Sequence, residues 1–90
     1  MNYYIAESQF DFNDLDCPSI EIIIDSLANI EDELDPEGVW TYMGSYKLHY
    51  WIDENKPNDV FCNAFVLKDP EDENSTETYE YGYYFEITRG

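Results

Sequence analysis

The chain has 90 residues, of which 21 are Asp or Glu and only 4 are Lys or Arg, so its formal net charge is −17 at pH 7. This charge argues against direct binding to nucleic acid or to an anionic membrane, and favours binding to a basic surface. Hydrophobic residues make up 43% of the chain and aromatic residues 18%, which excludes an intrinsically disordered protein. The length predicts one domain over residues 1–90.

No part of the sequence has the pattern of a secreted or membrane-spanning protein. Residues 1–7 have neither a basic region nor an apolar run, so we expect no signal peptide. No apolar stretch approaches the roughly 20 residues of a membrane span. We therefore expect a cytoplasmic protein, in the host cytoplasm if a phage encodes it. Cys17 and Cys62 are predicted to be reduced core residues, with a single disulfide as the alternative if the chain is exported by another route.

The first half of the chain predicts one strand and one helix. The strand is expected over residues 2–7, and an irregular segment over residues 8–16 carries the apolar anchors Phe10, Phe12 and Leu15. The helix is expected to begin with Asp16 or Cys17 as its N-cap and Pro18 in its first turn. Residues 35–38 are expected to end it. Near-helical spacing predicts a stripe buried against a sheet, formed by Ile20, Ile23, Ile24, Leu27 and Leu34, with Ala28 and Ile30 beside it.

The second half of the chain predicts strands. Residues 39–43 and 46–52 flank Gly44 and Ser45, which fit a two-residue hairpin turn with glycine first. Residues 60–67 are apolar on both faces, which predicts a central strand. Residues 79–87 show the clearest alternation in the chain. The predicted fold is α+β: a mostly antiparallel sheet of about five strands in the order β-α-β-β-β-β, with one amphipathic helix packed on one face.

Acidic residues lie on the helix and in two dense runs, residues 31–37 and residues 69–73, with a smaller cluster of Asp53, Glu54 and Asp59 at another loop. On the helix, Glu21, Asp25 and Asp32 are expected to face solvent. A compact domain of this length is about 31 Å across, and a DNA duplex about 29 Å long carries 17 charges. Mimicry of a duplex requires the helix face to be contiguous with at least one acidic run. The candidate partner-binding residues are Glu21, Asp25, Glu31, Asp32, Glu33, Asp35, Glu37, Asp69, Glu71, Asp72 and Glu73.

Aromatic residues add a second candidate contact surface. Trp40, Tyr42 and Tyr84 are expected on the less buried face of the sheet, where such rings commonly contribute to interfaces. Tyr79, Tyr81 and Tyr83 are instead expected to cover the sheet.

No constellation of residues predicts catalysis or a cofactor. Cys17, His49 and Cys62 lack the paired spacing of a zinc site. A calcium loop starting at Asp69 would have Asn74 where an EF-hand needs glycine. In a chain with 21 acids, some pair of carboxylates always lies at a distance that suits hydrolysis, so such a pair carries no information. We therefore expect a protein that is not an enzyme and binds no metal or cofactor.

In size and charge the chain resembles small acidic inhibitors, often encoded by phages or plasmids, such as anti-CRISPR and anti-restriction proteins. The resemblance rests on no aligned residues. It implies a non-catalytic DNA mimic, monomeric or a small homo-oligomer, that binds a defence nuclease or a CRISPR effector subunit at its nucleic-acid site. The alternative is an immunity-type protein that neutralises a basic toxin or nuclease. Adaptation to a salty cytoplasm is a further explanation of the charge.

Overall fold

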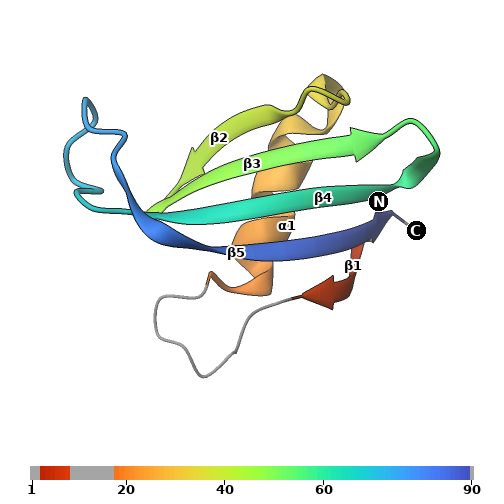
Figure 1. The fold of residues 1–90 in the computed structure, drawn as a ribbon, viewed down its shortest axis with the longest axis horizontal. Coiled ribbons are helices and arrows are strands. Elements are labelled where there is room, and N and C mark those ends of the chain that lie inside the picture. The colour runs from red at the N-terminus through yellow and green to blue at the C-terminus, as the bar shows by residue number, and fades with distance from the viewer. Residues whose placement is uncertain (1–2, 9–17, 90) are drawn as a thin grey trace.

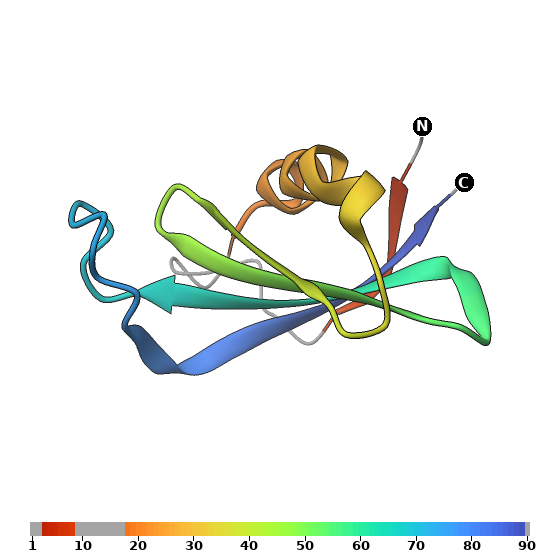
Figure 2. The ribbon, with the colours of Figure 1, turned by 90° about the horizontal axis from the view of Figure 1, so that it is seen from above.

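The computed structural model describes residues 3–8 and 18–89, which form a twisted sheet crossed on one face by a single helix (Figures 1 and 2). The predicted α+β class, with an antiparallel sheet and one helix, is confirmed. Within these residues, no helix has both the length and the apolar character that crossing a membrane requires. In chain order the elements are β1 (Tyr3–Ser8), α1 (Ile20–Ile30), the 3-10 helix η1 (Glu31–Glu33), β2 (Val39–Met43), β3 (Tyr46–Asp53), β4 (Lys56–Leu67) and β5 (Thr78–Arg89).

The strands lie in the order β1-β5-β4-β3-β2, and every neighbouring pair is antiparallel. Strand β4 lies between β3 and β5, so the prediction of a central strand over residues 60–67 is confirmed. Its two faces are both apolar because one packs in the core under α1, whereas the other carries Phe61 and Phe65, which stack on Trp51 and Trp40. Its register places Cys62 opposite Tyr50 on β3 and Phe85 on β5. These three side chains therefore share the face that α1 covers.

The hairpin between β2 and β3 turns as the sequence predicts. Gly44 has a positive φ of +58. Ser45 has a negative φ, because glycines are the only described residues with a positive φ. A positive φ at the first turn position alone is the signature of a type II′ turn, whose twist matches that of the flanking strands.

The start of the helix differs from the prediction. Ser19 is the N-cap, and its hydroxyl accepts a hydrogen bond from the Ile22 backbone N–H at 3.3 Å. Asp16 and Cys17 are therefore not the cap, and Pro18 precedes the helix instead of lying in its first turn. A serine hydroxyl can accept a hydrogen bond from the free backbone N–H three residues later and so cap a helix. The helix therefore starts after Ser19, later than expected. The irregular segment predicted beyond Ser8 lies outside the described residues.

The helix also ends earlier than predicted and buries a narrower stripe. Ile30 has φ −117, so the α-helix ends there and η1 follows, before residues 35–38. Ile23, Leu27 and Ile30 are buried against the sheet as expected. Ile20, at the helix start, is 40% exposed, contrary to the prediction. Ala28 is exposed as well, because it lies on the side of the helix away from the sheet.

The helix and sheet are joined by apolar packing and one buried hydrogen bond. The Tyr50 hydroxyl donates to the Ile23 carbonyl at 2.7 Å. Cys62 is a free, fully buried thiol, as predicted, whereas Cys17 lies outside the described residues. Desolvation raises the pKa of Cys62 to about 12, so this thiol stays protonated and unreactive at neutral pH. The buried core consists of Ile23, Leu27, Ile30, Leu48, Tyr50, Val60, Cys62, Ala64, Val66, Tyr83, Phe85 and Ile87.

Candidate partner-binding site

Three carboxylates form an exposed line on α1 and η1, which we call the helix face: Glu21, Asp25 and Asp32. All three side chains are exposed. Asp32 lies beyond the end of α1, on η1. Glu21 and Asp25 are four residues apart on α1, so they lie within about 40° of each other around the helix axis, and this step rises about 6 Å. That step is close to the distance between successive phosphates of a strand, about twice the 3.4 Å rise per base. The step from Glu21 to Asp25 thus places two charges at a spacing similar to that of a nucleic-acid backbone.

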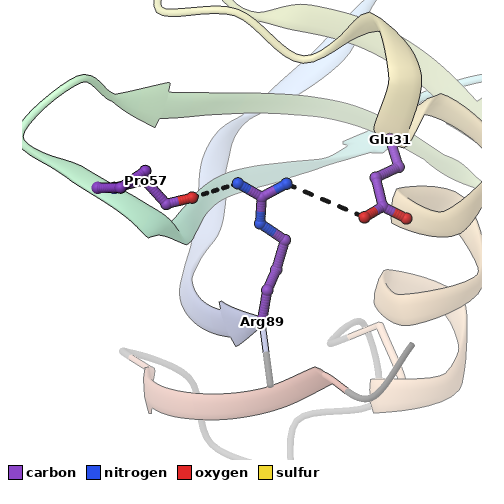
Figure 3. A network of polar contacts seen from close by, with 3 residues as sticks. All are labelled: Glu31, Pro57 and Arg89. Carbon is purple, nitrogen blue, oxygen red and sulfur yellow. Dashed lines mark hydrogen bonds and ion pairs between the residues drawn. The ribbon is translucent and has the colours of Figure 1, made fainter.

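The helix face continues without a break into residues 31–37, which we call the acidic turn. Its first member, Glu31, is held by Arg89 near the end of β5, with Nη1 and Oε1 3.9 Å apart (Figure 3). Arg89 also donates to the Pro57 carbonyl at the start of β4. Glu31 therefore connects the helix end to the sheet and is partly neutralised, whereas Asp32, Glu33 and Glu37 are exposed.

Asp35 fixes the path of the acidic turn. Its Oδ1 accepts from the Gly38 N–H at 2.7 Å, and its carbonyl accepts from the Ile52 N–H at 3.4 Å. Gly38 has φ +98, and a Cβ there would lie 2.1 Å from Nε2 of His49. Glycine is therefore required at this position both by backbone conformation and by space. These contacts hold the acidic turn at the end of β3 where Ile52 lies.

The second run, residues 69–73, which we call the acidic loop, lies at the opposite end of the sheet (Figures 1 and 2). At its start, the Leu67 N–H donates to the Ser45 carbonyl at 2.9 Å, next to the hairpin between β2 and β3. Strand β3 separates the two acidic segments: from Tyr46, near the acidic loop, to Ile52, near the acidic turn, it spans about 20 Å at 3.3 Å per residue. The structure therefore joins the helix face to the acidic turn but not to the acidic loop, which contains exposed Asp69, Glu71, Asp72 and Glu73.

The four basic side chains do not neutralise the helix face. Lys47 lies over the Trp40 ring, with Nζ 4.6 Å from the ring centroid, and Lys68 lies 5.9 Å from the Tyr79 ring. Arg89 is paired with Glu31. Lys56 is exposed and pairs with Asp53 in the strand register. Among the described residues, no Lys or Arg forms an ion pair with Glu21, Asp25 or Asp32.

The sheet face opposite α1, which we call the open face, carries a set of stacked aromatic rings. Trp40 and Tyr42 are 51% and 50% exposed, as predicted for the less buried face, and Tyr84 is half-buried. The Trp40 ring stacks on His49 with centroids 4.4 Å apart, and His49 stacks on Trp51 at 5.2 Å. The open face is thus partly covered by its own rings.

The prediction that Tyr79, Tyr81 and Tyr83 cover the sheet is only partly correct. Tyr83 is buried, but Tyr79 and Tyr81 are 42% and 44% exposed. Two extra residues of β5 lie between the pairs Phe65–Gly82 and Leu67–Thr78, so the strand is irregular there. The two exposed rings stack on each other with centroids 5.7 Å apart.

A hollow at the Ile52 end of the open face, the Trp51 hollow, was not predicted. It has a volume of about 590 Å³ and combines aromatic rings with carboxylates. The alternation of residues 46–52 does place Trp51 and His49 on one face, but only the register brings Phe61 beside them. Its lining consists of Pro36, Trp51, Ile52, Asp53, Glu54, Asn55, Phe61 and Tyr84.

Within the described part of the chain, no three His, Cys, Asp or Glu residues are grouped so that they could hold a metal ion. No protein family, curated protein or solved structure matches this chain closely enough to show a relationship.

Proposed function

We propose that this protein is a non-catalytic inhibitor that binds a basic, nucleic-acid-binding surface by presenting carboxylates in place of phosphates. Its partner would be a defence nuclease or a CRISPR effector subunit, as for a phage-encoded anti-CRISPR or anti-restriction protein acting in the host cytoplasm. The observation that carries the proposal is the helix face, where Glu21, Asp25 and Asp32 are exposed and no Lys or Arg of the described residues pairs with them.

Energetics support a binding role for this charge. Like charges four residues apart destabilise a helix by about 0.2–0.5 kcal/mol per pair. Solubility of a small domain needs a net charge of only about 2–8, whereas this chain carries −17. The helix fixes Glu21 and Asp25 about 6 Å apart along its axis, so the spacing of these two carboxylates is set before a partner binds. A cationic cleft would attract such a surface over long range, and association would slow as salt screens the charges.

The second candidate function is an immunity-type protein that neutralises a basic toxin or nuclease. The half-exposed rings of the open face favour it, because tryptophan and tyrosine anchor protein interfaces. Such a protein can bind beside the active site of its target, so it need not compete with nucleic acid.

A capture experiment with two charge-matched variants tests the proposal. The protein is immobilised and exposed to a lysate of the organism that carries or hosts its gene, and the captured protein is purified. One variant combines Glu21→Gln, Asp25→Asn and Asp32→Asn on the helix face. The control combines Asp69→Asn, Glu71→Gln and Glu73→Gln in the acidic loop. Both variants lose three charges, so any difference between them reports the position of the charge.

The measurements are the affinity of each variant for the captured partner and competition with a short DNA duplex. We expect the helix-face variant to bind about tenfold or more weakly, the control to bind nearly as the parent, and duplex DNA to displace the protein. A partner that holds DNA and this protein at once would contradict mimicry and support the immunity-type function. Equal losses for the two variants would mean that only net charge matters.

A further inference from the structure

The Trp51 hollow pairs aromatic rings with carboxylates at one end of the open face. Trp51 packs on Phe61 with ring centroids 5.8 Å apart and lies 6.4 Å from the Tyr84 ring. Asp53 and Glu54 line the same hollow. The Tyr84 hydroxyl donates to Glu86 Oε1 at 2.9 Å, which adds a third carboxylate nearby. Aromatic rings attract cations through their electron-rich faces, and carboxylates attract them through charge.

We infer that this hollow is a binding site for an arginine side chain of a partner protein, an inference that rests on the proposed binding of a basic protein. The chain itself shows the chemistry, since Lys47 lies over the Trp40 ring at 4.6 Å and Lys68 over the Tyr79 ring at 5.9 Å. Within residues 18–89, no Lys or Arg lies over Trp51. Trp51 stacks on His49 and Phe61. Trp40 also stacks on His49 and still has Lys47 over its ring, so a cation from outside the chain can lie against Trp51 in the same way.

Arginine fits the hollow better than lysine or a nucleotide base. Its planar guanidinium can stack on an aromatic ring while donating two parallel hydrogen bonds to a carboxylate, whereas the lysine ammonium acts as a point charge. An exposed aromatic sheet face can also stack the bases of a single-stranded nucleic acid. Here a net charge of −17 and the carboxylates at the rim oppose the phosphates of such a ligand.

The walls of the hollow are held in place before a ligand binds. The Asp53 side chain accepts from the Asn55 N–H at 2.9 Å, which fixes the turn that carries Glu54. The acidic turn supplies Pro36 and is fixed by the contacts of Asp35 and Gly38. A fixed site loses less entropy on binding than a mobile one. The acidic turn follows the helix face and supplies Pro36 to the hollow, so a partner on the helix face can extend its contact around the Ile52 end of β3 to reach the hollow.

The two tryptophans provide an internal comparison for the test. The protein is titrated with N-acetyl-arginine amide, and the indole N–H resonances of Trp51 and Trp40 are followed by two-dimensional NMR. The neutral control ligand is N-acetyl-citrulline amide, which has nearly the same shape without the charge. We expect saturable shifts at Trp51 with a dissociation constant in the millimolar range, small shifts at Trp40, and no saturable response to citrulline.

Two variants refine the result. Glu54→Gln is expected to weaken arginine binding about two- to fivefold, the effect of one exposed ion pair. Glu73→Gln in the acidic loop removes one charge far from the hollow and is expected to leave the affinity for arginine unchanged. Equal shifts at both tryptophans, an equal response to citrulline, or saturable shifts at Trp51 with oligothymidine but not with arginine would overturn the inference. These outcomes need no partner, so they are independent of the capture experiment, which tests the helix face.

Discussion

The two faces of the sheet differ in how their large apolar side chains are shielded from water. On the face that α1 covers, Leu48, Tyr50 and Phe85 are fully buried. On the open face, Trp40 remains 51% exposed and is shielded by neighbouring rings and by the Lys47 side chain. One helix is long enough to cover one face, so the second face relies on stacking between aromatic side chains. The comparison shows that one side of a small sheet can supply the buried core while large aromatic side chains stay partly exposed on the other side.

The largest loss of stability, and the largest difference between the two faces, should appear when one phenylalanine on each face is truncated in separate variants. Phe85→Ala is expected to lower the free energy of unfolding by about 3–5 kcal/mol, because it opens a cavity in the core. Phe61→Ala should cost about 1–2 kcal/mol, since Phe61 is half-buried and loses mainly ring contacts. Urea unfolding, followed by circular dichroism, measures both. Equal losses would mean that the open face is as well packed as the covered one.

Alkaline pH should weaken the covered face through its buried ionisable groups. Burial raises the pKa of Cys62 from its ordinary value of 9.0 to about 12. Between these pH values the unfolded chain releases the thiol proton and the folded chain keeps it, so the free energy of unfolding falls as pH rises from about 9 to about 12. Burial raises the pKa of Tyr50 too, which acts in the same direction.

We expect the combined loss to be a few kcal/mol and to appear in urea midpoints measured at intervals from pH 8 to pH 11. Cys62→Ala removes one of the two groups, so its stability should decline less steeply over that range than that of the parent. The same slope in both proteins would show that the thiol does not contribute to the decline.

The smallest loss of stability should appear when one tyrosine hydroxyl on each face is removed in separate variants. Tyr50→Phe deletes the buried hydrogen bond to the Ile23 carbonyl and is expected to cost about 1–2 kcal/mol. Tyr84→Phe deletes the bond to Glu86 on the open face and should cost less than about 0.5 kcal/mol, because water can replace it. Thermal unfolding compares the pair. A larger loss for Tyr84→Phe would reverse the roles assigned to the two faces.

Local patterns predicted much of the fold and part of the candidate site. Alternation in residues 46–52 and 60–67 identified the buried sides of two strands, and the glycine-first hairpin turn follows from Gly44. Helix boundaries were less predictable, because Ser19 competes with Asp16 and Cys17 as a cap and several residues can end a helix. Exposure of the helix-face acids followed from helical spacing, and the acidic turn follows the helix directly in the chain, but no local pattern indicates where the acidic loop lies.

By itself, the sequence determined the α+β class, the excess of negative charge and the side of the helix on which Glu21, Asp25 and Asp32 lie, because these depend on composition and on short-range periodicity. Only the tertiary structure decided that the acidic turn is held at the Ile52 end of β3 while the acidic loop lies at the other end of the sheet. It also decided that Trp51, Phe61 and Tyr84 meet beside Asp53 and Glu54. These neighbours come from three strands, and strand order and register arise from long-range pairing that no single segment encodes.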